Sequence, residues 1–147
     1  MSITEPRSST DVAAPLRLAI TRMARRLRQE AGPGLTPSQL AALVSIERHG
    51  PLSPSGLAEI EGISRPSATR ILGGLLDSGL VERRPDPEDG RSALVEIEAA
   101  GRELLTRIRS RKNAYLSRRL AGLEPDELEA LDRAAGILER LLEQDRA

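Results

Sequence analysis

The polar side chains best suited to recognition chemistry lie between residues 64 and 70. The stretch Ser64-Arg65-Pro66-Ser67-Ala68-Thr69-Arg70 combines three hydroxyl groups with two arginines. Hydroxyls bond to phosphate oxygens and base edges, and an arginine can donate two parallel hydrogen bonds to O6 and N7 of guanine. If one helix face presents these groups, the chemistry that they can perform is recognition of a DNA duplex.

A helix that begins near Ser64 would present these side chains together. Apolar residues follow at the spacing of one buried helix face, at positions 68, 71, 72, 75 and 76. Because successive residues are rotated by about 100°, the opposite face centres on Pro66 and Arg70. Small residues around a single arginine allow a helix backbone to approach the major groove. We therefore predict as DNA-contacting residues Ser64, Arg65, Pro66, Ser67, Thr69 and Arg70.

Two further helix starts precede this segment. Thr36-Pro37-Ser38-Gln39 has the pattern of a capping box with proline in the first turn, and Ser53-Pro54 repeats the cap-then-proline order. The helix that starts at Ser53 is short and is joined to the next through Glu61-Gly62-Ile63. Two short helices connected in this way, the second amphipathic, predict a helix-turn-helix.

A polar-tipped hairpin is predicted directly after these helices. The segments 80–84 and 92–97 are strand-like, and the turn formers of Pro85–Arg91 separate them. A hairpin in this place is a wing, whose tip arginine can enter the minor groove. We predict that Asp89 bonds the turn or the Arg91 side chain and thereby aims that arginine. Adjacent strand residues point to opposite faces, so at most one of Arg83 and Arg84 faces DNA. The predicted wing contacts are Arg84, Asp89 and Arg91.

The terminal segments carry more apolar surface than one chain can cover. A helix over about 11–30 has one apolar stripe, and a last helix from Glu124 has two apolar lines. Packing against a second copy would cover them, although burial within the same subunit is the alternative. The residues predicted for dimerisation are Leu16, Ile20, Leu128, Leu131, Leu138 and Leu142.

Composition excludes several function classes. There are no cysteines and only one histidine, His49, so thiolate zinc sites, thiol redox switches and histidine-rich metal sites are excluded. No phosphate-binding glycine loop is present, and we predict no catalytic residue, no metal and no cofactor. No apolar run is long enough to span a membrane, so a soluble, cytoplasmic protein is expected.

The zero net charge conceals two oppositely charged segments. Residues 98–122 carry seven basic and two acidic side chains, whereas residues 123–147 carry three basic and eight acidic ones. These two helical segments could pair with each other across a helical hairpin. A charge distribution without a general basic excess argues against a nonspecific architectural DNA-binding protein.

Several motifs resemble the signature of the MarR (multiple antibiotic resistance regulator) family of winged helix-turn-helix transcriptional regulators. They include Ile63–Arg70, Leu75–Arg83, the Asp-x-Arg of Asp86–Arg91, and Ala100-Gly101-Arg102. The resemblance implies a dimer built from the first and last two helices, a recognition helix in the major groove and a wing arginine in the minor groove. It also implies a repressor that is released by a small molecule, often phenolic, bound between the dimer and DNA-binding regions.

Two positions differ from the family pattern. Glu98 stands where the family usually has a capping threonine before the helix that follows the wing, and glutamate is a poorer cap. Tyr115 is the sole aromatic residue, so a pocket lined by aromatic side chains is not expected, while an aliphatic cleft remains open. We favour a core or interface position for Tyr115 over a ligand contact.

These observations predict a mostly α protein with a small β-hairpin wing. Residues 1–10 are expected to form a flexible arm and residues 11–147 a single unit. Within that unit, 11–35 and 98–147 would form the dimerisation helices and 36–97 the winged helix-turn-helix. The predicted function is a homodimeric, sequence-specific transcriptional regulator on a pseudo-palindromic operator in double-stranded DNA. A winged-helix protein-interaction module that does not bind DNA is the alternative from another class.

Overall fold

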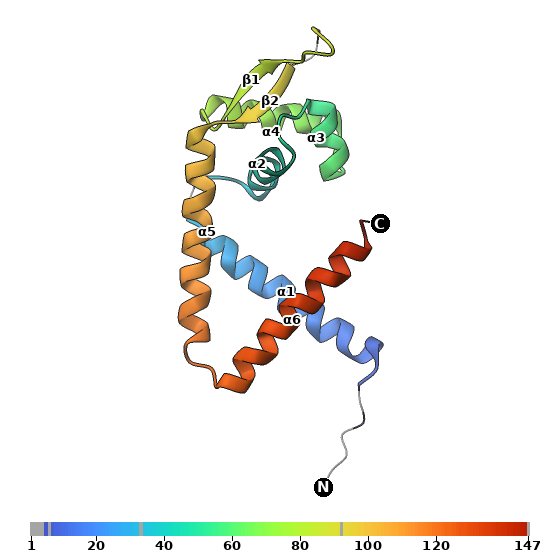
Figure 1. Ribbon diagram of the computed structural model, residues 1–147, viewed down its shortest axis with the longest axis vertical. Coiled ribbons are helices and arrows are strands. Elements are labelled where there is room, and N and C mark those ends of the chain that lie inside the picture. The colour runs from blue at the N-terminus through green and yellow to red at the C-terminus, as the bar shows by residue number, and fades with distance from the viewer. Residues whose placement is uncertain (1–4, 6, 33, 92, 147) are drawn as a thin grey trace.

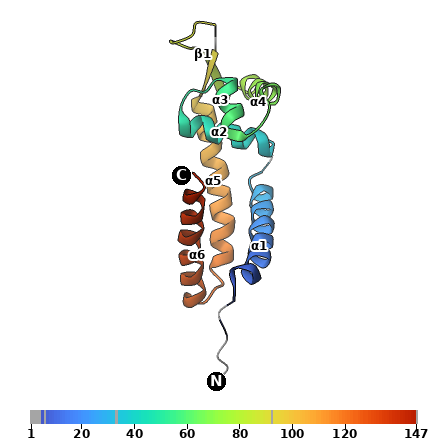
Figure 2. The same ribbon diagram turned by 90° about the vertical axis from the view of Figure 1, so that its right-hand side faces the viewer.

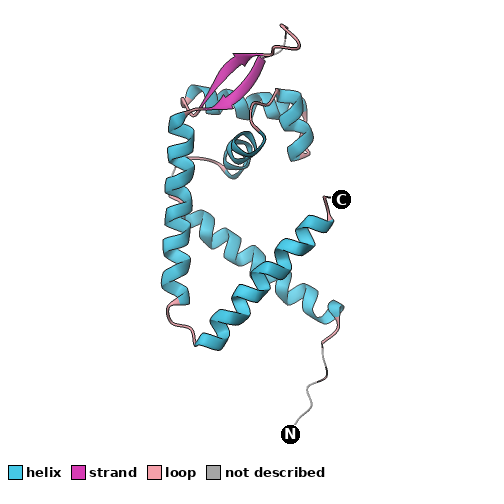
Figure 3. Cartoon of the chain, viewed as in Figure 1, coloured by secondary structure: helices cyan, strands magenta, loops and turns pink. Residues whose placement is uncertain are grey.

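The computed structural model describes residues 5, 7–32, 34–91 and 93–146. It is mainly helical with one two-stranded antiparallel hairpin, as Figure 3 shows. This architecture confirms the predicted fold class. The elements in chain order are α1 (Ser9–Glu30), α2 (Pro37–His49), α3 (Pro54–Glu61), α4 (Arg65–Asp77), β1 (Val81–Pro85), β2 (Ala93–Ile97), α5 (Ala99–Leu120) and α6 (Pro125–Gln144).

The predicted helix starts of the central region are confirmed by their capping bonds. The Thr36 hydroxyl accepts from the Gln39 backbone N–H at 3.1 Å, and the Gln39 side chain accepts from the Thr36 N–H at 3.1 Å. Ser53 caps α3 by accepting from the Gly56 N–H at 3.0 Å. Ser64 caps α4 in the same way. These side chains satisfy backbone donors that the first helical turn leaves unpaired, and so define where each helix begins.

The first helix begins earlier than predicted. Ser8 and Asp11 form a capping box, in which the Ser8 hydroxyl accepts from the Asp11 N–H at 3.2 Å and donates to Asp11 Oδ2 at 2.8 Å. Residues 9 and 10, which were expected in the flexible arm, therefore belong to α1, because the capping box of Ser8 and Asp11 starts the helix before them. Residues 1–4 and 6 of that arm, and Ser92 of the second predicted strand, lie outside the described residues.

A single apolar core joins α2, α3, α4, the hairpin and the start of α5. Its most completely buried large side chains are Leu43, Ile46, Leu57, Leu75 and Leu105. The hairpin pairs Val81 with Ile97 at its base, and an isolated bridge joins Leu52 to the other edge of β2 at Val95. We call α2, α3, α4 and the hairpin the winged unit, because they share this core.

The winged unit lies at one end of the molecule, and the hairpin is its outermost part (Figure 1). The long helix α5 runs from the base of the hairpin toward the opposite end. α1 and α6 cross in that view, but they lie on opposite sides of α5 when the molecule is turned (Figure 2). α5 is therefore the element that connects the winged unit to both terminal helices.

The terminal helices α1 and α6 have no buried residue. Leu16 and Ile20 on α1 are 39% and 45% exposed, and Leu131 and Leu142 on α6 are 49% and 57% exposed. Leu128 is exposed as well, whereas Leu138 is half-buried, so most of these apolar side chains are not covered within the described subunit. None of the described helices is both long and apolar enough to cross a membrane.

Gly101 allows the first turns of α5 to approach the winged unit closely. It is buried, and a methyl group in its place would collide with the Leu80 carbonyl oxygen and crowd the Ile97 side chain. The Glu98 N–H donates to the same Leu80 carbonyl at 2.9 Å. As expected from its residue type, Glu98 makes no capping bond through its side chain at the start of α5. Backbone contact with Leu80 secures this helix start instead.

Candidate DNA interface

The outward face of α4 carries the side chains predicted for DNA contact. Ala68, Leu72 and Leu75 are buried, whereas the residues around Arg70 on the other side face solvent. Ser67 is half-buried and receives a hydrogen bond from the Ser64 hydroxyl at 2.8 Å. The exposed members of the predicted set are Ser64, Arg65, Pro66, Thr69 and Arg70.

The capping bonds divide the α4 residues by role. The Ser64 hydroxyl donates to the Ser67 hydroxyl and accepts from the Ser67 N–H at 3.2 Å, so these two side chains stabilise the start of the helix. Thr69 and Arg70 lie one turn further along, and their side chains make no hydrogen bond or ion pair with other described residues. Arg65 and Arg70 are the exposed cations of this face.

Two aspartates shape the tip of the wing. Asp86 Oδ1 accepts from the Glu88 N–H at 2.9 Å, and Asp89 Oδ1 accepts from the Arg91 N–H at 3.1 Å. Such aspartate turns fix the backbone direction over two residues. The predicted bond between Asp89 and the turn is thus confirmed, and it is the Arg91 backbone that is held. The Arg91 side chain is exposed at the outer end of the hairpin.

Of the two adjacent arginines on β1, one is held across the hairpin. Arg84 Nη1 donates to Glu96 Oε2 at 2.9 Å, so the Arg84 charge is balanced within the wing. Its predicted contact with DNA stays a prediction. The Arg83 side chain points to the other face and is exposed, with no hydrogen bond or ion pair to another described residue. Strand alternation predicts that these two arginines point to opposite faces. The ion pair between Arg84 and the diagonal Glu96 could be found only from the register of the hairpin, and Arg83 is the one of the two without such a pair.

Three glutamates meet at the base of the hairpin. Glu82 lies directly across from Glu96, and Glu98 follows on the same side of β2. A hydrogen bond with Glu98 and another with Glu96, reinforced by their negative charges, raise the pKa of Glu82 from 4.5 to about 7. The negative charges of Glu96 and Glu98 disfavour the ionised form of Glu82, which is why its pKa is raised. Sequence analysis missed this group, since its members are adjacent only across the strands.

Tyr115 is buried between two arginines. The guanidinium groups of Arg26 and Arg119 lie 5.2 and 5.5 Å from the centre of its ring, and Arg26 Nε donates to the phenolic oxygen at 3.2 Å. The bond from Arg26, followed by that from Arg119, lowers the pKa of Tyr115. Tyr115 is thus buried within the subunit, and the preference for a core or interface position over a ligand contact stays a prediction. It joins α1 to α5 by stacking and hydrogen bonding, and it also borders a polar hollow with Arg118.

A different hollow lies where α1 ends, α2 begins and α5 passes. Its volume is about 330 Å³. The floor is aliphatic, with Leu35, Leu40 and Ile108, and Arg25 and Arg28 border it on the α1 side. No aromatic side chain lines it among the described residues. The hollow therefore fits the aliphatic cleft that composition left open, and it could accept a small apolar molecule with an anionic group.

The helix-turn-helix, the exposed α4 face and the hairpin with an outward arginine together define a winged helix-turn-helix protein that binds DNA. The MarR family model matches residues 35–93. An uncharacterised helix-turn-helix-type transcriptional regulator of Mycobacterium leprae is 36% identical over 138 residues, covering 93% of this chain and 96% of the relative. The multiple antibiotic resistance protein MarR of Salmonella typhimurium is 30% identical over 99 residues, covering 67% of this chain and 69% of that protein.

A crystal structure of a putative transcriptional regulator from Pseudomonas aeruginosa is similar throughout. It is 33% identical, superposes with a TM-score of 0.83, and the match covers 92% of this chain and 98% of that one. The chain belongs to the MarR family and is a DNA-binding transcriptional regulator. Neither the fold nor the relatives indicate an enzyme family.

The glutamate cluster predicts a pH-dependent stability. Folded Glu82 keeps its proton up to about pH 7, whereas in the unfolded chain it is released near 4.5. The folded state binds more protons between these values, so the stability contribution of Glu82 is full at low pH and falls as the pH rises through about 5 to 7. We expect Glu82→Gln to flatten this decline and to raise the melting temperature at pH 8. Thermal unfolding followed by circular dichroism between pH 5 and 8 measures it.

Glu59→Gln is the matched control, because Glu59 is an exposed acid on α3 outside the cluster. Its melting curve should follow that of the unmodified protein at every pH. If Glu82→Gln shifted all melting temperatures by one constant amount, the raised pKa of Glu82 would be refuted.

Proposed function

We propose that the protein acts as a homodimeric repressor that binds a pseudo-palindromic operator and is released by a small-molecule effector. The observation that carries this proposal is the uncovered apolar surface of the terminal helices, at the end away from a complete winged unit. Two copies joined through α1 and α6 would present two recognition helices related by a two-fold axis. Such a dimer reads two half-sites about one helical turn apart.

Each winged unit would contribute two kinds of DNA contact. The α4 face around Arg70 would read base edges in the major groove, and Arg91 on the wing would lie in the minor groove. Ser64, Arg65, Pro66, Ser67 and Thr69 would approach the backbone and adjacent bases, and Asp89 would orient the wing tip. Arg84, held by Glu96, would act through the shape of the wing or reach a phosphate at its edge. An operator occupied in this way is closed to other proteins, which is the basis of repression.

The proposal as a whole is tested by selecting bound duplexes from a random pool with the purified protein. A two-fold symmetric motif with half-sites about 10 bp apart supports it. A single asymmetric motif would count against binding as a dimer. Recovery of unrelated sequences would count against sequence-specific binding.

The dimer prediction concerns the α6 stripe. Replacing Leu131 and Leu142 together by glutamate places two charges on the surface proposed to meet the second copy. Because both side chains are about half exposed in the subunit, we expect a folded monomer with far weaker operator binding. Sedimentation equilibrium at micromolar concentration, together with circular dichroism, measures assembly and folding.

Arg140→Glu makes the same total change in charge on the polar side of α6 and should remain dimeric. Dimers that persist in the double leucine variant would exclude this stripe as the interface. Leu128 and Leu138, which lie on the same helix, would then also lose their proposed role, whereas Leu16 and Ile20 on α1 are tested by the corresponding glutamate variants of that helix.

The recognition helix and the wing should lose different properties when mutated. Arg70→Ala should cost about 1 to 3 kcal/mol on the preferred duplex and relax the preference at one position of each half-site. Arg91→Ala should weaken binding to many sequences more evenly and make the salt dependence shallower, because the minor groove offers little sequence code. Asp89→Ala should be a milder form of Arg91→Ala. Titrations of specific and scrambled duplexes at two salt concentrations separate these effects.

The expected division of labour can fail in a clear way. If Arg70→Ala weakened both duplexes equally while Arg91→Ala affected only the specific one, base reading would belong to the wing. Circular dichroism and sedimentation confirm beforehand that each variant is folded and dimeric.

Effector release would act through the hollow between α1, α2 and α5. A ligand there would touch the terminal helix α1, the winged unit at Leu40 and the connecting helix at Ile108, so it could change their relative positions. We expect at least one member of a panel of small phenolic and aliphatic carboxylic acids to weaken operator binding. Leu40→Phe, which fills the hollow, should keep DNA binding and lose that response. A panel without effect on the unmodified protein would remove effector release from the proposal.

A further inference from the structure

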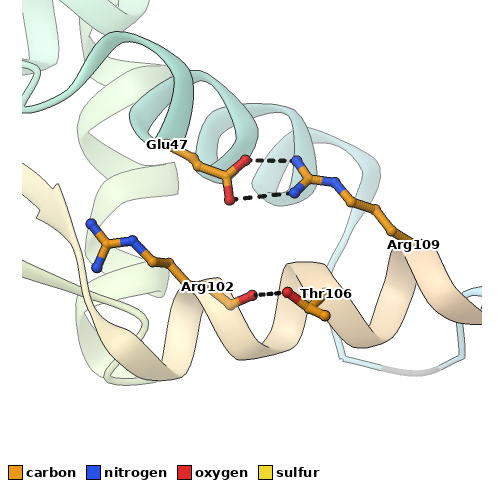
Figure 4. Close-up of polar contacts among 4 residues, drawn as sticks. All are labelled: Glu47, Arg102, Thr106 and Arg109. Atoms are coloured by element: carbon orange, nitrogen blue, oxygen red, sulfur yellow. Dashed lines mark hydrogen bonds and ion pairs between the residues drawn. The ribbon is translucent and has the colours of Figure 1, made fainter.

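The side chains of Glu47 on α2 and Arg109 on α5 form a two-point ion pair. Arg109 Nη2 donates to Glu47 Oε1 at 2.7 Å, and Arg109 Nη1 donates to Glu47 Oε2 at 3.3 Å. Figure 4 shows the two planar groups facing each other across the space between the helices. Parallel bonds between two planar groups restrict direction as well as distance. Glu47 and Arg109 therefore constrain the angle at which α2 lies against α5.

The position of this pair in the molecule gives the constraint its importance. Leu105 is the last α5 residue in the core of the winged unit, and Arg109 follows one turn later. Ile108, the residue before Arg109, is also buried, so the pair holds the winged unit to α5 at the edge of the apolar contact between them. On the neighbouring part of α5, Arg111 Nη1 donates to the carbonyl oxygen of Ala31, where α1 ends. α5 is consequently bonded to the winged unit and to a terminal helix within two residues.

Other polar groups on this stretch of α5 do not compete for Glu47. The Thr106 hydroxyl donates within its own helix to the Arg102 carbonyl oxygen at 3.0 Å, as Figure 4 shows. The hydrogen bond to Glu47 raises the pKa of Arg109, so the guanidinium keeps its charge. The Arg109 side chain is 50% exposed and that of Glu47 29% exposed. Exposed pairs add little to stability, so the pair can be removed without unfolding the protein.

We propose that Glu47 and Arg109 are positioning residues that set the angle of the winged unit on α5, and thereby the operator spacing that the dimer accepts. The inference rests on the proposed function, because it needs two winged units on one duplex. In a dimer, α5 connects each recognition helix to the terminal helices that would form the interface. A fixed angle at α2 and α5 fixes the separation of the two recognition helices. A loosened angle lets the same dimer accept half-sites that are closer together or further apart.

The test measures binding to a series of operators in which the spacer between half-sites is shortened or lengthened by one and two base pairs. The proteins are the unmodified chain, Glu47→Gln, Arg109→Lys and the exchange Glu47→Arg with Arg109→Glu. Lysine keeps the charge of Arg109 but loses its two-point geometry. We expect the ratio of affinities for the best spacing and for a spacing one base pair different to fall at least threefold in both single variants. The exchange should recover much of the ratio.

Arg107→Lys is the matched control, because Arg107 is exposed on the same helix and makes no bond with the described residues. Its spacing ratio should equal that of the unmodified protein. Affinity for a single half-site and the melting temperature should stay unchanged in all variants. If the pair had only a general structural role, the variants would lower these two quantities instead.

Two failures are distinguishable. An unmodified protein that is monomeric, or that binds one half-site as tightly as two, overturns the proposed function and this inference with it. A dimeric unmodified protein with a clear spacing preference that Glu47→Gln and Arg109→Lys both retain overturns the inference alone. Equal loss in Arg107→Lys would also overturn it, because the effect would then follow from replacing any arginine of this stretch of α5 and not from the pair with Glu47.

Discussion

The close packing of the first turns of α5 on the winged unit is the constraint on which the molecule depends. Leu105 is buried in the core, and Gly101 brings the helix backbone against the Leu80 carbonyl at the base of the hairpin. α5 therefore begins as part of the DNA-binding core and ends among the terminal helices. A side chain at position 101 would separate these two parts of the chain. This contact fixes the point at which α5 starts from the winged unit, and the position of α1 and α6 depends on it.

Much of the fold was predictable because local signals and the hydrophobic pattern agreed. Thr36, Ser53 and Ser64 each combine a capping side chain with proline in the first turn, and each begins a helix where expected. The spacing of Ala68, Leu72 and Leu75 predicted the buried face of α4, and the outward face was then the opposite side of the helix. Agreement between local propensity and burial pattern is what makes such predictions reliable.

What the sequence concealed are the contacts between elements distant along the chain. The glutamate cluster depends on hairpin register, and the pairing of Arg84 with Glu96 depends on a diagonal across two strands. The expectation that basic α5 and acidic α6 pair is not met in the described residues, where no ion pair joins them. Instead, Arg109 of α5 reaches α2. Charge counts along a chain identify available partners, but the direction of each helix decides which partners meet.

The length of α5 turns small rotations into large displacements. Its 22 residues form a rod of about 33 Å at about 1.5 Å per residue. A tilt of about 6° at one end of such a rod moves the other end by about 3.5 Å, close to the rise of one base pair in DNA. The same small change in angle would have little effect between two short elements. At the far end of α5 it moves the attached helices by a full base-pair step along the double helix. The angle at which α5 leaves the winged unit therefore determines where the terminal helices lie relative to the recognition helix.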